Sequence, residues 1–341
     1  MKRLLNTLYV LTEDSYLSKQ GETICVHVGG AEKIRVPVHT LESILCFGNT
    51  TVSTPLIAFC GEKGIGLAFY SDQGRFYGRI EGPVRGNVLL RTKQYSAAST
   101  EQALLMAKNF VATKIANGRN ILLRSARDSN NHEADSKLKK AAQKIAYLSS
   151  QLATAENHDQ IRGIEGIVAN RYFAVFDCMV KVNKEDFYFE KRSKRPPMDR
   201  VNALLSFLYM LLANDIRSAL EGVGLDPAVG FLHAMRPGRP SLALDIMEEL
   251  RAPLCDRLAL ALIKLKQVQG DGFELTPTAV RMTEETRKTV ITAWQKRKMD
   301  EITHPFLEEK MPIGLIPHIQ SQLLARYLRG DLDSYPPFYW K

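Results

Sequence analysis

The pattern of apolar residues changes abruptly near residue 81, and this change limits the folds that the chain can adopt. Before it, short runs rich in Val, Ile, Tyr and Phe end in Gly, Asn, Asp or Ser, which is typical of strands joined by turns. After it, long runs rich in Ala, Leu, Lys and Gln are typical of helices. The sequence therefore predicts an α+β protein in which a small β-rich domain precedes a larger all-α domain.

We expect residues 1–80 to form a small β-sandwich that carries one short helix. The helix is predicted from TPLIAFCGEKG, which begins at Thr54 and Pro55 and ends at a glycine. The strand-like runs are NTLYVL, ETICVHVGG, EKIRVPV, SILCFGN, GIGLAFY and GRFYGRI. Residues 81–98 are expected to be a linker, and residues 99–341 the helical domain. Its helices are expected within 100–156 and at about 160–178, 199–220, 241–268, 277–301 and 315–329.

Charge and cysteine content narrow the class of protein. Residues 1–85 hold nine basic and eight acidic residues, whereas the rest of the chain holds 37 basic and 29 acidic residues. A positive field on the helical part favours a polyanionic partner such as a nucleic acid. The five cysteines are far apart and form no C-x-x-C pair, so we expect reduced thiols in a cytoplasmic protein. The longest apolar run, residues 204–213, is too short to span a bilayer, so no membrane association is expected.

One glutamate lies on an otherwise apolar helical face. In IRGIEGIVANRYFAVF, a helical period places Glu165 on the face of Ile161, Val168 and Tyr172. A buried carboxylate needs compensation, so it either reaches solvent or a cation at the edge of the core, or it binds a metal ion. Both interpretations remain open on this segment alone.

A histidine precedes a second group of acids. His233 lies in FLHAMRPGRP, and a helix that we expect to begin with Ser241 as its N-cap follows, carrying Asp245, Glu248 and Glu249 opposite its apolar face. By themselves these acids are typical of a solvated face. Asp245 and Glu248 are also i,i+3 neighbours, however, and a short loop would allow His233 to fold back towards them. One imidazole and up to three carboxylates, with Glu165, suit Mg²⁺ or Mn²⁺.

Basic residues lie close to these segments in the sequence. FYFEKRSKRPPMDR places Arg192, Lys194 and Arg195 beside aromatic residues, before a helix that Asp199 caps. Arg236 and Arg239 lie in the loop that follows His233. Such groups bind phosphates, and aromatic rings stack on unpaired bases, although a solvated loop has the same composition.

Taken together and in order, three segments resemble the CRISPR-associated adaptation integrase/endonuclease family, in particular the form found with type I-C systems. They are IEGIVANRYFAVF, the helix after KRSKRPP, and GFLHAMRPGRPSLALDIMEELRAPLCDR. The resemblance implies that Glu165, His233 and Glu248 are the catalytic metal ligands and that Asp245 is an additional acid near the ion. It also implies that Mg²⁺ or Mn²⁺ is the cofactor. Some members carry aspartate where this chain has Glu248.

The same resemblance implies an activity and partners. Members insert protospacer DNA into CRISPR arrays, because a DNA 3′-hydroxyl attacks a phosphodiester of the repeat. The expected partners are double-stranded protospacer and repeat DNA, a second copy of the chain joined through the N-terminal domain, and a small ferredoxin-like CRISPR adaptation protein. Two alternatives remain open, namely a nuclease that repairs branched DNA and a non-catalytic DNA-binding scaffold.

Overall fold

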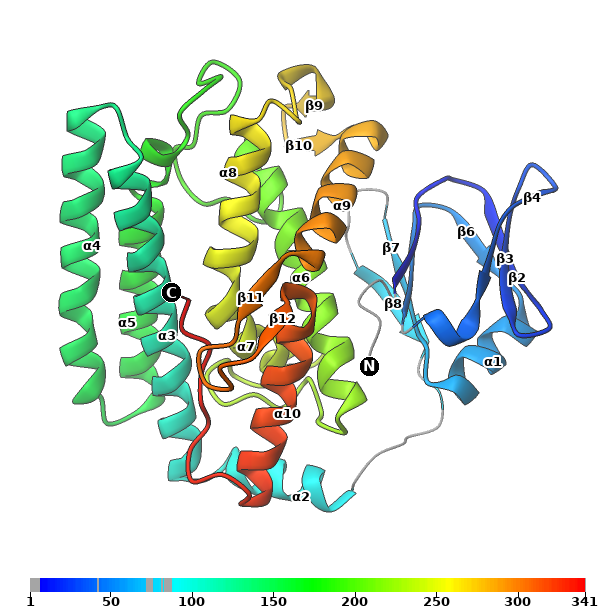
Figure 1. Ribbon diagram of the computed structural model, residues 1–341, viewed down its shortest axis with the longest axis horizontal. Coiled ribbons are helices and arrows are strands. Elements are labelled where there is room, and N and C mark those ends of the chain that lie inside the picture. Colours follow the sequence, from blue (N-terminus) through cyan, green and yellow to red (C-terminus); the bar gives the residue numbers. More distant parts are fainter. Residues whose placement is uncertain (1–6, 42, 72–75, 81, 83–87, 341) are drawn as a thin grey trace. The chain divides into compact units, whose positions relative to one another are not determined.

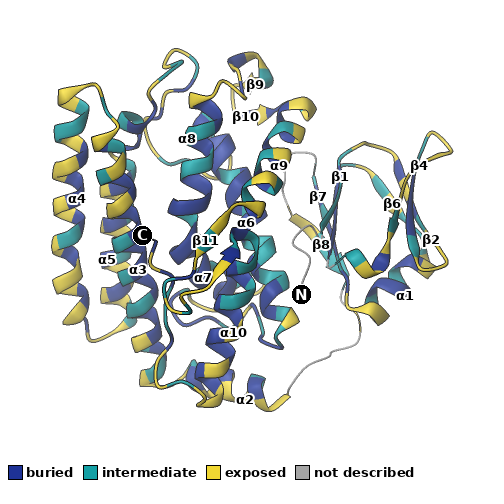
Figure 2. Ribbon diagram, in the orientation of Figure 1, coloured by how far each residue is buried: buried dark blue, intermediate teal, exposed yellow. Residues whose placement is uncertain are grey.

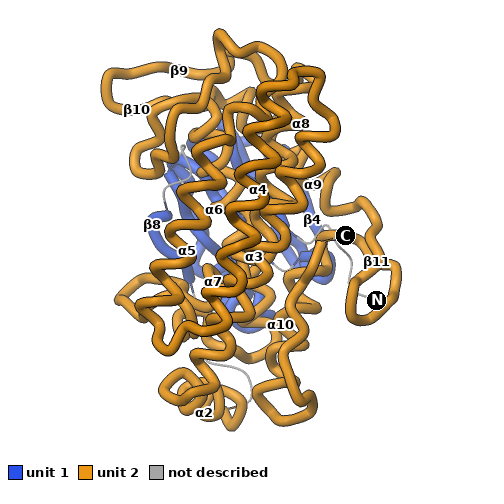
Figure 3. Tube along the Cα trace, turned by 90° about the vertical axis from the view of Figure 1, so that its left-hand side faces the viewer, with its two compact units in different colours: residues 1–85 blue, residues 86–341 orange. Residues whose placement is uncertain are grey.

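The structure is a computed structural model that describes residues 7–41, 43–71, 76–80, 82 and 88–340. The chain divides into two compact units, residues 1–85 and residues 86–341, called here the N-terminal unit and the helical unit (Figures 1 and 3). Strands dominate the first and helices the second, which confirms the expected α+β fold class. Asn6 and residues 74–75 of the expected strands, and most of residues 81–87 of the expected linker, lie outside the described residues.

The N-terminal unit contains two four-stranded sheets and one helix. The first sheet has the order β1 (Thr7–Val10), β5 (Ser43–Phe47), β7 (Gly66–Tyr70), β8 (Phe76–Ile80), with only β8 antiparallel to its neighbour. The second has the order β4 (Ala31–Pro37), β3 (Thr23–Val28), β2 (Ser15–Gln20), β6 (Thr50–Val52). Leu17, Ile44 and Leu56 represent the core that both sheets share with helix α1 (Thr54–Lys63).

The expected short helix is confirmed, and two strands were missed. Pro55 lies in the first turn of α1, and Gly64 ends the helix with a positive φ of 72°. Strand β2 was not predicted because four of the six residues of SYLSKQ are polar, and β6 was not predicted because it has only three residues.

The helical unit contains the following elements: α2 (Val88–Ala97), α3 (Glu101–Arg127), α4 (His132–Ala153), α5 (His158–Phe173), α6 (Arg200–Gly222), α7 (Ser241–Arg251), α8 (Arg257–Lys264), α9 (Glu284–Met299) and α10 (Ile316–Arg329). Helices α3, α4 and α5 pack against one another, and α7 packs against both α3 and α6 (Figure 1). A π-helical turn, Ala252–Asp256, joins α7 to α8, where Pro253 has no N–H to continue the α-helical hydrogen bonding. Burial follows this packing, since α4 exposes one face and buries the other (Figure 2).

Three expectations for this unit are corrected. Residues 88–97 are not linker but helix α2, which buries Leu90 and Gln94. The helix expected from residue 277 begins at Glu284, because residues 273–282 form the hairpin of β9 (Phe273–Thr276) and β10 (Ala279–Met282) around Pro277. A second hairpin, β11 (Glu301–Thr303) and β12 (Lys310–Pro312), also shows that the unit is not purely α-helical.

Helix α6 is long and apolar enough to cross a bilayer by length and composition, and it is the one helix of that kind among the described residues. It packs against α7 and α10, and thirteen of its residues are buried, so it serves as the core helix of the unit. All five cysteines lie in the described part of the chain and are free thiols.

Candidate metal and nucleic-acid site

Helix α7 buries the three acids that we expected on a solvated face. Asp245, Glu248 and Glu249 are 0%, 3% and 0% exposed. The helix is covered by α3, by α6 and by the C-terminal tail, defined here as residues 331–340. Because a buried carboxylate is costly without partners, each of the three has its own set of contacts.

Asp245 organises the loop before α7. Its Oδ2 accepts hydrogen bonds from the backbone N–H groups of Phe231 (2.6 Å) and Leu232 (3.0 Å), and its Oδ1 accepts one from that of His233 (2.9 Å). A β-carbon at Gly230 would lie 2.7 Å from Asp245 Oδ2, so only glycine allows this close approach. The loop is therefore fixed at its base by one carboxylate.

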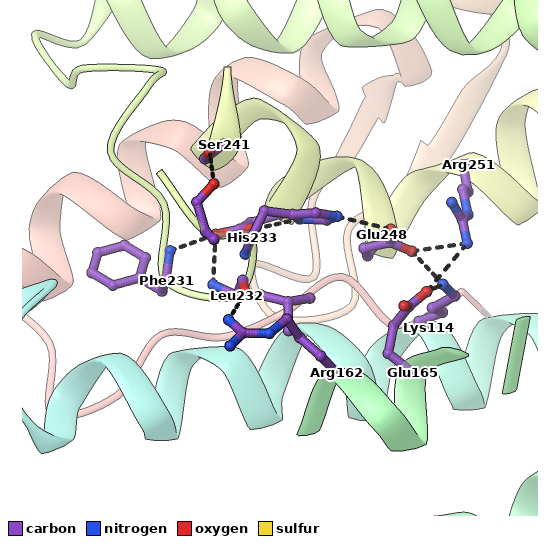
Figure 4. A network of polar contacts seen from close by, with 11 residues as sticks. Lys114, Arg162, Glu165, Phe231, Leu232, His233, Ser241, Glu248 and Arg251 are labelled. Carbon is purple, nitrogen blue, oxygen red and sulfur yellow. Dashed lines mark hydrogen bonds and ion pairs between the residues drawn. The ribbon is translucent and has the colours of Figure 1, made fainter. Parts of the chain in front are cut away.

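The same carboxylate orients the imidazole. His233 Nδ1 lies 2.7 Å from Asp245 Oδ1, so in the neutral ring Nδ1 carries the proton and Nε2 carries the lone pair. Nε2 faces Glu248 Oε1 at 3.9 Å (Figure 4). The expected folding back of the loop towards α7 is thus observed, with Asp245 behind the ring and Glu248 in front of it.

The start of α7 differs from the prediction. Pro240 occupies the N-cap position, and Ser241 is the first helical residue. Ser241 Oγ donates to the carbonyl oxygen of Ala234 at 3.1 Å, so it ties the helix to the histidine loop instead of capping it. The N–H of Leu242 is satisfied by the carbonyl oxygen of Pro227 at 2.9 Å.

Glu165 borders the apolar face of α5. The buried stripe consists of Ile161, Ile164, Val168 and Tyr172, and the Glu165 side chain, 24% exposed, lies beside it. Its carboxylate forms an ion pair with Lys114 of α3, so a cation compensates for its partial burial. Asn170 and Arg171 lie on the other side of the helix, as expected, and Arg171 is exposed there.

Two cations join Glu165 to Glu248 (Figure 4). Lys114 Nζ contacts both Glu165 Oε1 and Glu248 Oε2, the latter at 2.9 Å. Arg251 lies 3.1 Å from Glu248 and 3.9 Å from Glu165. Burial by itself raises the pKa of the Glu248 carboxyl, but the positive charges of Arg251 and Lys114 outweigh it and lower that pKa below its ordinary value. Glu248 is therefore a carboxylate at neutral pH.

Among the described residues, no group of three acidic, histidine or cysteine side chains is arranged to hold an ion, and Lys114 lies between the two glutamates. The donor set nevertheless fits a hard divalent cation. Two carboxylates and one imidazole nitrogen belong to one connected group of contacts, in which the buried Glu248 Oε2 has Lys114 and Arg251 as ion-pair partners but forms no regular hydrogen bond. Glu165, Glu248 and His233 are the residues that could hold such an ion.

The basic loop, residues 191–195, divides into inward and outward groups. Arg192 points inward, where it donates to Asn202 (2.6 Å) and Ser206 (3.1 Å) and lies over the Tyr209 ring. Lys194 and Arg195 are exposed. Although Lys194 is exposed as a residue, partial burial of its amine lowers the pKa of that amine, and the charges of Arg251 and Arg192 lower it further. The amine therefore lies within electrostatic reach of the site.

Further cations lie around the histidine loop. Arg236 is exposed and Arg239 is partly exposed, in a turn that Gly238 closes with a positive φ. Arg162 of α5, which sequence reasoning did not select, donates to the carbonyl oxygen of Leu232 at 3.4 Å (Figure 4). Asp199 caps α6 as predicted, since it accepts from the N–H of Asn202 at 2.7 Å.

Glu249 holds the C-terminal tail. It accepts hydrogen bonds from Tyr335 Oη (2.7 Å), the N–H of Phe338 (2.8 Å) and Gln320 Nε2 (2.9 Å). Asn117 of α3 donates to the carbonyl oxygens of Glu249 and Phe338. The tail therefore links the two helices that carry Lys114 and Glu248.

Lys114 and Arg251 were also missed by sequence reasoning, although both left a signal. Lys114 interrupts the buried face that Val111 and Ile115 form on α3, and Arg251 follows Glu248 at the i+3 position. A lone charge on an apolar face is the same signal that drew attention to Glu165.

Comparisons with known proteins agree with this architecture. The sequence model of the family described as "CRISPR associated protein Cas1" matches residues 8–296. CRISPR-associated endonuclease Cas1 1 of Chlorobaculum tepidum is 49% identical over 343 residues, which cover all of both chains. Two solved structures share the fold at lower identity. A Cas6-RT-Cas1–Cas2 complex matches with a TM-score of 0.84 and 22% identity, covering 98% of this chain and 36% of the other. A casposase bound to integration product matches with a TM-score of 0.82 and 20% identity, covering 98% and 94%.

Proposed function

This chain belongs to the Cas1 family of CRISPR-associated proteins, and we propose that Glu165, His233 and Glu248 form its metal-binding catalytic centre. The protein is accordingly an endonuclease and integrase of spacer acquisition. One observation carries the proposed centre: side chains from α5, from α7 and from the loop before α7 converge around Glu248.

We propose Mg²⁺ or Mn²⁺ as the cofactor, held by carboxylate oxygens of Glu165 and Glu248 and by His233 Nε2. When bound, such an ion supplies positive charge to the pentacoordinate phosphate and acidifies the attacking hydroxyl. Asp245 contributes from behind, because its hydrogen bond to Nδ1 keeps the lone pair of the imidazole on Nε2.

The protein's own part in the reaction is mainly positioning and charge. A protospacer 3′-oxygen forms a new bond to phosphorus, the bond between that phosphorus and a repeat 3′-oxygen breaks, and the attacking hydroxyl gives up its proton as the leaving oxygen gains one. Lys194, Arg195, Arg236 and Arg239 are proposed to bind the flanking phosphates. Arg192 is proposed to hold the loop in place, since its contacts with Asn202 and Ser206 direct it inward.

The proposed partners are double-stranded protospacer and repeat DNA, a second copy of this chain, and a small ferredoxin-like adaptation protein, in a cytoplasmic system of type I-C. The similarity to a chain of a Cas6-RT-Cas1–Cas2 complex supports the small partner, and the casposase bound to integration product supports DNA as substrate. Exposed apolar residues of the N-terminal unit, among them Ile34 and Tyr77, support a protein interface there.

The test is an in vitro joining assay with a supercoiled repeat-containing plasmid and short duplexes. We expect E165A, H233A and E248A each to lose at least about 100-fold of the joining rate while DNA binding stays within about twofold. EDTA should abolish joining by the wild-type protein. Unchanged biological function in these variants would indicate a scaffold, and cleavage of branched DNA without any joined product would indicate a repair nuclease.

A further inference from the structure

Lys114 lies at the centre of the candidate site, yet the proposed reaction assigns no role to it. Its side chain is 8% exposed, and its ammonium contacts Glu165 and Glu248 from two different helices (Figure 4). Within the described part of the chain these carboxylates are the ion-pair partners of Lys114. Burial of an ammonium is unfavourable unless opposite charges compensate for it. The two glutamates therefore stabilise the buried Lys114, and Lys114 in turn stabilises the two glutamates.

A divalent ion would need the same carboxylate oxygens. Lys114 and Arg251 together match the charges of Glu165 and Glu248 one for one. A doubly charged ion added to this balanced group would leave two surplus positive charges in a poorly solvated space, where like charges repel strongly. This repulsion favours the withdrawal of one of the two side-chain cations when the ion binds.

The geometry selects Lys114 as the cation that withdraws. Both side chains are largely buried, but Arg251 has a further contact, because its guanidinium lies 5.7 Å from the centre of the Tyr209 ring. Lysine ends in a compact ammonium on a flexible stem, which can swing away without moving the helix.

Building on the proposed function, we propose that Lys114 is an internal counter-ion that occupies the metal position in the metal-free protein and is exchanged for the divalent ion. In the metal-free protein it keeps the Glu165 carboxylate of α5 beside the Glu248 carboxylate of α7. The exchange makes metal binding weaker than binding to the same three ligands without Lys114, because the ion must displace a cation that is already bound. Lys114 is thus a positioning residue that acts through the two glutamates.

The first test measures Mn²⁺ affinity from the electron paramagnetic resonance signal of the free ion. We expect K114M to bind Mn²⁺ at least tenfold more tightly than wild type, to melt at a lower temperature without metal, and to gain more thermal stability from Mn²⁺. K114R keeps the charge and should bind no more tightly than wild type. K298M is the matched control, because Lys298 forms an equally buried pair with Asp215 at 2.9 Å and should affect melting but not Mn²⁺ affinity.

The second test uses the wild-type protein, so that it does not depend on the folding of a variant. Lysine acylation followed by mass spectrometry should label Lys114 at least fivefold more with Mn²⁺ present, while Lys298 stays unchanged. Equal protection of Lys114 in both states would overturn the exchange, as would a folded K114M that binds Mn²⁺ no more tightly than wild type. Absence of Mn²⁺ binding by the wild-type protein would instead overturn the proposed function, and the exchange with it.

Discussion

Asp256 is a buried carboxyl in the π-helical turn behind the site. It accepts hydrogen bonds from Tyr209 Oη at 2.5 Å and from Tyr172 Oη at 2.9 Å. Burial raises its pKa to about 6, although Tyr209 and the charge of Arg251 act in the opposite direction. The folded protein therefore holds this proton more tightly than the unfolded chain does.

This pKa leads to a prediction for the stability of D256N. A raised acid pKa gives stability that is fully present below the ordinary pKa of 3.8 and is lost as the pH rises through about 6. The free energy of unfolding of wild type relative to D256N should accordingly fall by about 2 kcal/mol between pH 4 and pH 7. Urea denaturation across this range measures it. A difference that stays constant with pH would contradict the prediction, and D215N serves as the control.

At the residue scale, sequence reasoning selected side chains that lie close together in the structure, but it did not predict their contacts. Glu165, His233, Asp245 and Glu248 do gather in one region of the helical unit. The sequence could not reveal that Asp245 accepts hydrogen bonds from three backbone N–H groups, because those donors belong to a loop whose path depends on tertiary packing. Nor could it pair Glu165 with Lys114, which lies 51 residues earlier in the chain.

At the scale of elements, the C-terminal tail connects α3 to α7. Asn117 is the central residue, since its amide donates to the carbonyl oxygens of Glu249 and Phe338 and accepts from the N–H of Trp340 at 2.7 Å. Asn117 is 1% exposed, so water cannot replace these contacts. One side chain thus satisfies three backbone groups from two segments.

We therefore expect N117A to lower the free energy of unfolding by about 2–3 kcal/mol, because three buried backbone groups lose their partner. Chymotrypsin should also cut the tail at Tyr335 and Phe338 more readily, as mass spectrometry of the fragments would show. N120A is the control, since Asn120 gives the tail a single hydrogen bond, to Trp340, and should cost less than half as much. Equal losses in both variants would argue against the central role of Asn117.

Most helices could be predicted from their periodicity, and the departures have local causes. Helix α7 looked like a surface helix with one acidic side, but nine of its eleven residues are buried, because the tail covers the side that the pattern assigned to solvent. The tail itself has no regular secondary structure, so no periodicity marked it as a packing partner. The hairpin of residues 273–282 was not predicted, because residues 277–282 of its sequence are also compatible with the start of a helix.

At the scale of the whole molecule, charge separates the two units. Nearly all of the excess of basic residues belongs to the helical unit, and the exposed cations Lys194, Arg195 and Arg236 are close in sequence to proposed parts of the site. This division, like the order of strands before helices, could be read from the sequence, since both depend on composition along the chain and not on tertiary contacts.

The charge distribution predicts a specific salt dependence of DNA binding. In the double variant K194E/R195E, the slope of log K against log salt concentration should become shallower by about 0.9 for each DNA phosphate that the variant no longer neutralises. Fluorescence anisotropy in EDTA between about 50 and 200 mM salt measures this slope. The exposed pair Lys140 and Lys144 on α4 offers a matched control, K140E/K144E. An equal change in this control would mean that the positive field is diffuse.

The contacts of Glu249 also bear on biosynthesis. The carboxylate oxygens of Glu249 accept hydrogen bonds from Tyr335 and Phe338, and the ribosome adds these two residues more than 80 residues after Glu249. Until residues 335–340 leave the exit tunnel, Glu249 lacks those two donors, so we expect α7 to remain incompletely packed. The region around Glu248, which we propose as the catalytic centre, is thus expected to reach its final structure only after the tail has been synthesised.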